Sequence, residues 1–271
     1  MLYNKKVFLK MTEFFADGWE RILAHNGLRG FADFWEADFE WFEPPNYRRG
    51  GWSGASRVVL ADPDGGEQVI FLKRQENHIR KTWRNPFAGE PTFRSEARNL
   101  RFLNSRNIAA PQLVYYAERK SEKGWQVVLA TRELTGYLPL DELLESWRRQ
   151  GWAKHRATRQ RLIPEVAGLM RHLHRYRQAH NALHAKHVFV HPEECRACLI
   201  DLEKMRPRLT RRQAMLRDLD SSNRHTFHLS RTDRLRFLLH YLQKDSFDEQ
   251  ARQLWRKLAE MERRKQRKRK Q

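Results

Sequence analysis

The chain has 271 residues, of which 40% are hydrophobic and 11% aromatic, and this composition excludes a wholly disordered protein. Lysine and arginine number 53 against 33 aspartate and glutamate, so the formal net charge is +20. A charge of this size favours a phosphate-rich partner, which can be a nucleic acid, an anionic membrane or a phosphorylated substrate. No stretch approaches the roughly 18 apolar residues of a membrane span, and the N-terminus lacks the apolar run of a signal peptide. We therefore expect a soluble, cytoplasmic protein, and its two cysteines, Cys195 and Cys198, fit a reducing compartment.

The first half of the chain is predicted to consist mostly of strands around one helix. Residues 11–43 carry aromatic side chains at helical spacing, which predicts helices up to Pro44 and Pro45, where the segment should end. The Gly- and Ser-rich stretch that follows, NYRRGGWSGAS at residues 46–56, predicts a loop.

A β-hairpin and a second antiparallel strand pair are expected next. Two apolar runs flank the turn sequence DPDGG at residues 62–66, so residues 56–74 predict a hairpin. A helix is expected over residues 93–105, and the stretches 113–117 and 125–130 predict the second pair.

The second half is predicted to be mostly helical. Helices are expected over residues 140–147, 162–173, 211–220, 233–242 and 247–262. Short strands are expected at 188–190 and 197–201. This order predicts an α+β fold with a cleft between unlike halves, an N-terminal lobe at 1–134 and a helical lobe at 135–262. Residues 263–271 carry seven basic side chains in nine, which predicts a solvated or disordered basic tail.

Two features of the first half suggest phosphate chemistry. A Gly-rich loop lets backbone N–H groups approach phosphate oxygens, although such loops are also common connectors. Lys73 ends an otherwise apolar strand, and a lysine there is unusual unless its ammonium group is paired. Glu96, on the helix that follows, is the natural partner, and a Lys–Glu pair of this kind positions the phosphates of a nucleotide. The alternative is a lysine whose ammonium group reaches solvent at the strand end.

A third feature is the stretch HNALHAKH at residues 180–187, which precedes a strand closing on Asp201. A divalent cation that bridges phosphates needs at least one hard carboxylate, and Asp201 stands where such a ligand is expected. The alternative is an ordinary helix-capping or turn aspartate.

These features occur within longer stretches that resemble a known family. The stretches, within residues 46–208, are RRGGWSGASRVVL, FLKRQENHIRKTWRNPFAGEPTFRSEARNL, TRELTGYLPL, LHRYRQAHNALHAKHVFV and LIDLEKMR. The chain resembles the protein-kinase-like superfamily and, within it, the bacterial lipopolysaccharide core kinase family of Kdo and heptose kinases, in particular its InaA-type branch. The resemblance implies a bilobal fold with an antiparallel β N-lobe and a mostly α-helical C-lobe. It also implies ATP and Mg²⁺ as cofactors and a lipopolysaccharide core sugar as phosphoryl acceptor, on the cytoplasmic side of the inner membrane.

The resemblance also implies roles for individual residues. The phosphate-covering loop would consist of Gly51, Ser53, Gly54 and Ser56. Lys73 would contact the α- and β-phosphates, Glu96 would orient it, and Glu133 would lie in the hinge beside the adenine. Asp201 would bind Mg²⁺, and His187 falls where kinases place the asparagine that holds a second metal ion.

The catalytic loop departs from the family pattern. Active members carry H-x-D there, whereas this chain has His180, Asn181 and Ala182. Alanine cannot accept the proton of the substrate hydroxyl, and general-base assistance is typically worth about 10²–10⁴-fold in rate. His184 is the local candidate for a base, at an ordinary histidine pKa of about 6.5, with a surface histidine as the alternative. Lys186, the second candidate, suits a phosphate contact.

Other functions remain open on the sequence alone. The alanine motivates a pseudokinase that binds a nucleotide or a partner without turnover. The net charge motivates a nucleic-acid-binding protein, but no RRM, KH, helix-turn-helix or OB signature is present. A lone CxxC supplies too few ligands for a structural zinc site. The basic strip at residues 74–84 could face an anionic acceptor or solvent, and Asp218 is expected to anchor the backbone of the catalytic loop from a helix below it.

Overall fold

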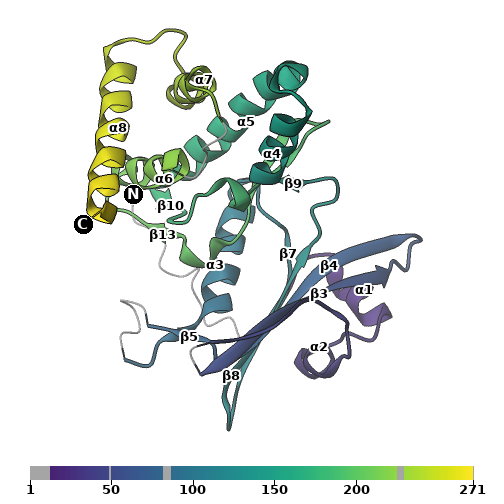
Figure 1. Cartoon of the computed structure of the whole chain (residues 1–271). Helices are drawn as coiled ribbons and strands as arrows, with labels where there is room; N and C mark the ends of the chain where they lie inside the picture. Colours follow the sequence, from purple (N-terminus) through teal and green to yellow (C-terminus); the bar gives the residue numbers. More distant parts are fainter. Residues whose placement is uncertain (1–12, 49, 82–86, 225–228, 271) are drawn as a thin grey trace. The chain divides into compact units, whose positions relative to one another are not determined.

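A computed structural model of the chain describes residues 13–48, 50–81, 87–224 and 229–270 (Figure 1). The chain forms two compact units, one comprising Met1–Asn104 and Pro111–Leu134 and the other comprising Ser105–Ala110 and Thr135–Gln271. The first unit is rich in strands and the second in helices, as expected of an α+β protein. No helix in the described ranges is long and apolar enough to cross a membrane.

The first unit is built on a six-stranded antiparallel sheet. In their spatial order the strands are β1 (Glu13–Phe15), β7 (Leu113–Ser121), β8 (Gly124–Arg132), β4 (Glu67–Glu76), β3 (Gly51–Ala61) and β2 (Trp41–Arg48) (Figure 1). Strand β4, which carries Lys73, is therefore an interior strand, with hydrogen-bonded neighbours on both sides.

The predicted hairpin is present as β3 and β4 and is longer than the prediction. The Asp62 N–H donates to the Gly66 carbonyl at 3.0 Å, and the Gly65 N–H donates to the Asp62 carbonyl at 2.9 Å. Gly65 and Gly66 have φ angles of 104° and 83°, which side-chain-bearing residues rarely adopt, so this turn requires its two glycines. The predicted second pair is also present, as β7 and β8.

Two predictions about the N-terminal region were wrong. Pro44 and Pro45 do not end a helical segment but lie inside β2, the edge strand of the sheet, at an irregularity between Glu43 and Asn46. Proline lacks the N–H that an interior strand needs, and an edge strand tolerates this loss. The expected loop at residues 46–56 is mostly strand as well, because β2 continues to Arg48 and β3 begins at Gly51.

Helices cover both faces of the sheet. They are α1 (Trp19–His25), α2 (Phe31–Glu36) and α3 (Thr92–Asn104), and the short strands β5 (Ile79–Arg80) and β6 (Glu90–Pro91) precede α3. Successive side chains of β4 point to opposite faces. Ile70 and Leu72 are buried in a core shared with α1 and α2, whereas Lys73 and Gln75 make hydrogen bonds with α3. The predicted helix at 93–105 is thus confirmed as α3, on the face toward which Lys73 points.

In the part of the chain that the structure describes, the second unit has five longer helices and two small sheets. The helices are α4 (Leu140–Gln150), α5 (Arg156–Arg175), α6 (Arg211–Arg224), α7 (Arg231–Leu242) and α8 (Glu249–Lys270). The sheets combine β9 (Leu138–Pro139) with β11 (Val188–His191) and β12 (Arg196–Leu199), and β10 (Gln178–Ala179) with β13 (Arg206–Pro207). All five predicted helices and both predicted strands of this half are present.

Residues 263–267 of the C-terminal basic segment are mostly solvent-exposed, as one of the two predicted alternatives had it, but the segment is not disordered. Helix α8 continues to Lys270, so residues 263–270 are helical rather than disordered. Lys265 forms an ion pair with the buried Asp220 of α6, and Asn223 donates a hydrogen bond to Glu262 at 2.8 Å. Lysine, arginine and glutamine are also good helix formers, so the segment combines high helix propensity with tertiary anchors.

Candidate functional site

The ion pair predicted between Lys73 and Glu96 is present in the first unit. The Lys73 Nζ donates to the Glu96 Oε1 at 2.7 Å. The Glu96 side chain is only 8% exposed, whereas that of Lys73 is 30% exposed, so the ammonium group keeps access to a ligand. Strand β4 supplies the lysine and α3 supplies the glutamate, and the two are consecutive long elements folded against each other.

The residues predicted as a phosphate-covering loop lie instead in strand β3. A Cβ atom on Gly51 would come within 2.1 Å of the Glu76 carbonyl oxygen, and one on Gly54 within 2.7 Å of the Trp41 ring. Both glycines are therefore required by close packing within the sheet. Ser53 pairs with Gln75 across β3 and β4, and Ser56 is fully buried. These positions were predicted as a loop because glycine and serine are typical of loops, while the close contacts are long-range and invisible in the sequence.

The Glu133 side chain, predicted to lie beside an adenine, is paired with an arginine. It accepts two hydrogen bonds from the Arg57 guanidinium, at 2.6 and 3.0 Å. The Glu133 backbone N–H donates to the Val69 carbonyl at 2.9 Å. This pair links the end of β8 to β3, so the side chain of Glu133 has a partner within the sheet.

The basic strip at 74–84 is not one surface. Arg74 is 6% exposed and donates to the carbonyls of Trp35 and Ala37 at 3.1 and 2.7 Å, with its guanidinium over the Trp41 ring. Arg74 therefore holds α2 against the sheet. Lys81 is exposed, and Arg84 lies outside the described residues.

In the second unit the two predicted metal ligands lie side by side. The His187 Nε2 is 3.2 Å from the Asp201 Oδ2. The His187 Nδ1 lies 2.7 Å from the Ala182 carbonyl oxygen and must carry a hydrogen to bond it. The His187 Nε2 and the Asp201 Oδ2 therefore face each other, and together they would hold a cation.

This arrangement fits a divalent cation in two respects. Metal-binding histidines usually donate their other ring N–H to a carbonyl or carboxylate, as His187 does to Ala182. The Asp201 side chain is 34% exposed, so an ion can reach it. Among the described residues no three His, Cys, Asp or Glu side chains form a metal-binding group, so further ligands would be water or phosphate oxygens.

Asp218 anchors the catalytic loop, as predicted. Its carboxylate is fully buried and accepts hydrogen bonds from the backbone N–H groups of His180 and Asn181, at 2.6 and 2.9 Å. The sequence analysis missed His174, whose Nε2 lies 3.1 Å from the same carboxylate and whose Nδ1 lies 2.8 Å from the Tyr241 hydroxyl. The only sequence signal for His174 is a polar residue within the apolar stripe of α5.

The catalytic-loop histidine itself is structural. The His180 side chain is buried, and burial lowers its pKa below the ordinary histidine value. Its Nε2 donates to the Ile200 carbonyl at 2.8 Å, directly before Asp201. His180 therefore ties its loop to Ile200, which follows strand β12 and directly precedes Asp201.

Three loop positions bear on the predicted proton transfer, and they are Ala182, His184 and Lys186. Ala182 is 5% exposed, and its carbonyl also accepts the His184 N–H at 2.8 Å. The His184 ring stacks on the His187 ring, with centroids 5.5 Å apart and an interplanar angle of 9°. Lys186 is exposed on a short 3₁₀ helix, Ala185–His187. Both candidates therefore lie close to His187 in sequence, and the His184 ring also contacts the His187 ring.

The cysteines do not form a disulfide or take part in these pairs. Both are buried free thiols, and burial raises the pKa of Cys198 to about 12. Cys198 is therefore an unreactive thiol in the interior of the second unit.

Comparison with known proteins identifies the family. The model of the lipopolysaccharide kinase (Kdo/WaaP) family matches residues 32–241, which is most of the chain. The chain belongs to this family. It is 29% identical to the protein InaA of Escherichia coli strain K12 over 195 residues, which cover 69% of this chain and 84% of InaA. The family and the InaA-type likeness predicted from the sequence are thereby confirmed.

The fold is confirmed by a solved structure, that of WaaP in complex with acyl carrier protein. It matches with a TM-score of 0.67 over 95% of this chain and 98% of WaaP, at 21% sequence identity. The family member thus has an α+β, protein-kinase-like fold. Four of the predicted site residues occur as two pairs, Lys73 with Glu96 in the first unit and His187 with Asp201 in the second.

Proposed function

We propose that this protein is an ATP-dependent kinase that phosphorylates a sugar hydroxyl of lipopolysaccharide core. The observation that carries the proposal is the ion pair between Lys73 and Glu96, at 2.7 Å, in a member of the lipopolysaccharide kinase family. In protein kinases a strand lysine paired with a helix glutamate must be in place for phosphoryl transfer.

The roles of the chain's residues follow from their chemistry. Lys73 binds the α- and β-phosphates of ATP, and Glu96 keeps the ammonium group directed toward them. Asp201 and His187 would hold Mg²⁺ through Oδ2 and Nε2, with the His187 ring oriented by the Ala182 carbonyl. A bound Mg²⁺ neutralises charge on the phosphates. Lys186 contacts a phosphate group, and His184 is the candidate that accepts the proton of the sugar hydroxyl.

The test is binding of Mg-ATP followed by transfer. A ligand at about a hundred times its Kd stabilises a protein by about 2.7 kcal/mol, which for a chain of this size raises Tm by about 5–10 °C. We expect this shift in the wild type and its loss in Lys73→Met and in Asp201→Asn. Both variants should still fold, with a lower apo Tm in Lys73→Met because the buried Glu96 carboxylate loses its partner. Lys81→Met removes an exposed lysine of the same unit and should keep the shift.

Transfer is then measured by incubating the protein with Mg-ATP and phosphatase-treated core oligosaccharide and looking for an added phosphate by mass spectrometry. Absence of any Tm shift at millimolar Mg-ATP in the wild type would refute nucleotide binding and with it the proposal.

One observation favours a second candidate function, a pseudokinase. Ala182 occupies the position of the catalytic aspartate, and its backbone carbonyl is already bonded to His184 and His187. The pseudokinase predicts the Mg-ATP-dependent Tm shift without phosphate transfer. The two candidates are therefore separated by the mass-spectrometric arm of the same experiment.

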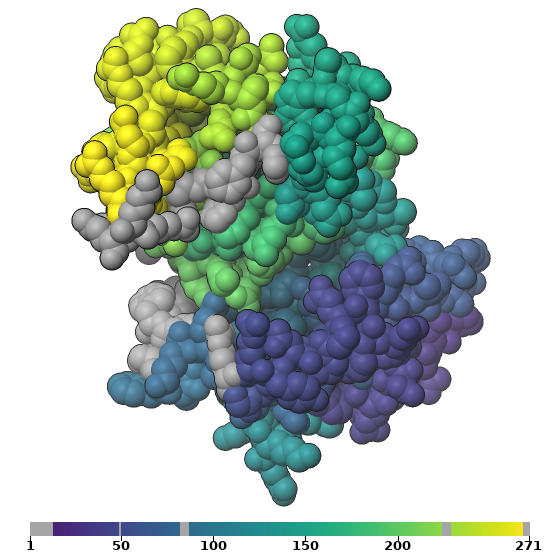
Figure 2. Space-filling view, in the orientation of Figure 1, coloured from purple at the N-terminus to yellow at the C-terminus, as the bar shows by residue number. Residues whose placement is uncertain are grey.

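The substrate of the proposed reaction is lipid-linked, and helix α8 offers a basic surface toward an anionic membrane. Arg263, Arg264 and Arg267 are exposed near its end, which is coloured yellow in Figure 2. Each basic residue close to an anionic leaflet contributes about 1 kcal/mol to binding, and the attraction falls off within a Debye length. Because the segment is helical and tied to α6 by Lys265, its charges are presented on a fixed element.

We expect Arg263→Gln, Arg264→Gln and Arg267→Gln, combined in one variant, to reduce sedimentation with phosphatidylserine-containing vesicles at low salt. Lys265 and its ion pair with Asp220 stay intact in this variant. The matched control loses the same charge from the first unit, by Arg29→Gln, Arg48→Gln and Lys120→Gln, all at exposed positions. Equal sedimentation of the two variants would show that net charge, and not α8, governs vesicle binding.

A further inference from the structure

Gln75 lies two residues after Lys73 on the same face of β4, and its side chain is fully buried. Its Oε1 accepts hydrogen bonds from the Thr92 hydroxyl at 2.8 Å and from the Phe93 backbone N–H at 3.1 Å. Its Nε2 donates to the His78 carbonyl at 3.1 Å. Every polar atom of this buried amide side chain therefore has a partner, and two of its three hydrogen bonds go to the start of α3.

These bonds cap a helix from a neighbouring strand. The first backbone N–H groups of a helix have no partner within the helix and are usually capped by a local side chain. In α3 the Phe93 N–H is capped by Gln75, which is 18 residues earlier in the chain. The Thr92 N–H also bonds out of the helix, to the His78 carbonyl at 3.3 Å. The N-terminus of α3 is thereby fixed to β4 and the residues that follow it.

The spacing of the two β4 contacts matches the spacing along α3. Lys73 and Gln75 are separated by two strand residues, or about 6.7 Å. Their partners, Glu96 and Thr92, are separated by four helix residues, or about 6 Å, and lie on one face of the helix. The two contacts run side by side. The cap therefore sets both the position of α3 along its axis and its rotation about that axis, and with them the place of Glu96 relative to Lys73.

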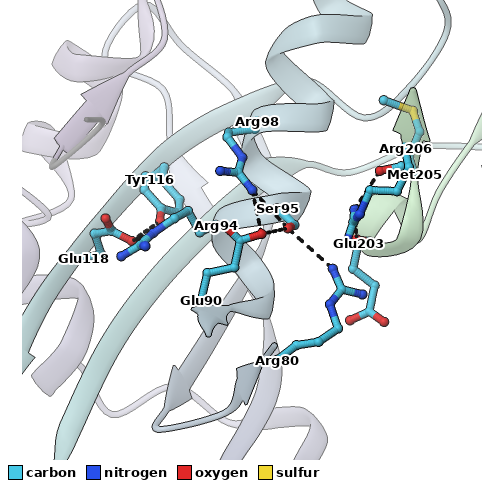
Figure 3. Close-up of polar contacts among 10 residues, drawn as sticks. All are labelled: Arg80, Glu90, Arg94, Ser95, Arg98, Tyr116, Glu118, Glu203, Met205 and Arg206. Carbon is cyan, nitrogen blue, oxygen red and sulfur yellow. Dashed lines mark hydrogen bonds and ion pairs between the residues drawn. The ribbon is translucent and has the colours of Figure 1, made fainter. Parts of the chain in front are cut away.

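Other contacts dock α3 without involving that face. Arg98 and Ser95 both donate to the Glu90 Oε1, at 2.7 and 2.8 Å (Figure 3). Arg94 donates to the Glu118 Oε2 at 2.7 Å, from which the Tyr116 hydroxyl is also 2.5 Å away (Figure 3). These contacts should keep α3 attached to the first unit when the Gln75 cap is removed. We therefore expect a substitution of Gln75 to change the alignment of α3 without unfolding the protein.

We propose that Gln75 is a positioning residue, whose side-chain amide aligns α3 so that Glu96 pairs with Lys73. The hydrogen bonds of the Gln75 side chain are present in the folded unit and form without a ligand. The consequence for nucleotide binding rests on the proposed function, whereas the consequence for the Lys73–Glu96 pair does not.

The experiment compares Gln75→Met with Gln126→Met. Gln126 is a buried glutamine on the adjacent strand β8, where it bonds Glu76 and Arg119 but not α3. The first readout is the rate at which an amine-reactive reagent modifies Lys73, measured by mass spectrometry of the Lys73 peptide. We expect Gln75→Met and Glu96→Gln each to raise this rate severalfold, and Gln126→Met to leave it unchanged.

The second readout is the Kd for Mg-ATP, which should rise about tenfold in Gln75→Met, the equivalent of one hydrogen bond. Gln75→Glu keeps the acceptor for Thr92 and Phe93 but loses the donor to the His78 carbonyl, so it should restore slow labelling only in part. If Gln75→Met does not fold, Thr92→Val removes the Thr92 bond from the helix side and should also speed labelling.

Unchanged Lys73 labelling in folded Gln75→Met, or equal acceleration in Gln126→Met, would overturn the proposal. Faster labelling in a protein whose wild type binds no Mg-ATP would support the positioning role and refute the proposed function, so the two failures are distinguishable.

Discussion

Replacing Asp218 by asparagine is expected to destabilise the protein more than any other single polar substitution discussed above. The buried carboxylate accepts three hydrogen bonds, from the His180 N–H, the Asn181 N–H and the His174 ring. Asparagine offers one oxygen and one NH₂ group, so at least one buried donor then faces another donor. Each unsatisfied buried donor costs about 1–3 kcal/mol. We expect a loss of roughly 2–4 kcal/mol, or a fall in Tm of about 5–15 °C.

Amide hydrogen exchange under native conditions tests whether the loss of stability arises at the loop that contains His180 and Asn181. The His180 and Asn181 amides should exchange faster in Asp218→Asn. The control is Asp220→Asn on the same helix, which removes a buried carboxylate paired with Lys265 instead. That variant should lower Tm without specific acceleration at the two loop amides. The anchoring role fails if both amides in Asp218→Asn exchange only at the rate of global unfolding.

The parts of the fold that were predictable are those with local signals. The turn DPDGG carries its own backbone geometry, and the long helices of the second unit repeat apolar residues at helical spacing. The Lys73–Glu96 pair was predictable as well, because a charged residue in an apolar strand needs a partner and the next helix along the chain supplies one.

The unpredicted features depend on residues far apart in the chain. Gly54 is glycine because the Trp41 ring occupies the space of a Cβ, and its place in a strand cannot be inferred from a Gly-rich composition. The last turns of α8 are held by Asp220, 45 residues before Lys265. Gln75 belongs to no apolar stripe or motif and carries no charge, so no sequence signal singles it out. Its role depends on where α3 begins in space.

The two site pairs differ in how far sequence reasoning reached. Asp201 was predicted as a carboxylate at the end of a strand and His187 by resemblance, and the structure adds the hydrogen bond from the His187 Nδ1 to the Ala182 carbonyl. This bond concerns the backbone of residue 182, so it does not depend on which side chain the residue carries. Alanine at position 182 thus offers no side-chain carboxylate, while the backbone contacts of the loop are present.

Because these hydrogen bonds go to the backbone carbonyl of residue 182, Ala182→Asp is the most direct test of the proposed kinase. The backbone bonds from His184 and His187 to residue 182 remain, and only the carboxylate is added. A positioned general base typically accelerates proton transfer by about 10²–10⁴-fold, or about 3–5 kcal/mol in the activation barrier. We expect Ala182→Asp to raise the rate of phosphate transfer to core oligosaccharide by a factor in this range.

The control is Ala182→Asn, which has nearly the same shape and no basic oxygen, and which should give no increase. Residue 182 is 5% exposed, so the new carboxylate is partly desolvated and the apo Tm of Ala182→Asp should fall by a few degrees. The rate is therefore measured well below that Tm, with the Mg-ATP-dependent Tm shift showing that the nucleotide still binds.

If Ala182→Asp leaves a measurable wild-type rate unchanged, the base is supplied elsewhere. His184→Ala should then abolish that rate, because His184 is the candidate base and its ring stacks on that of His187. A rate that His184→Ala leaves unchanged would remove His184 from candidacy.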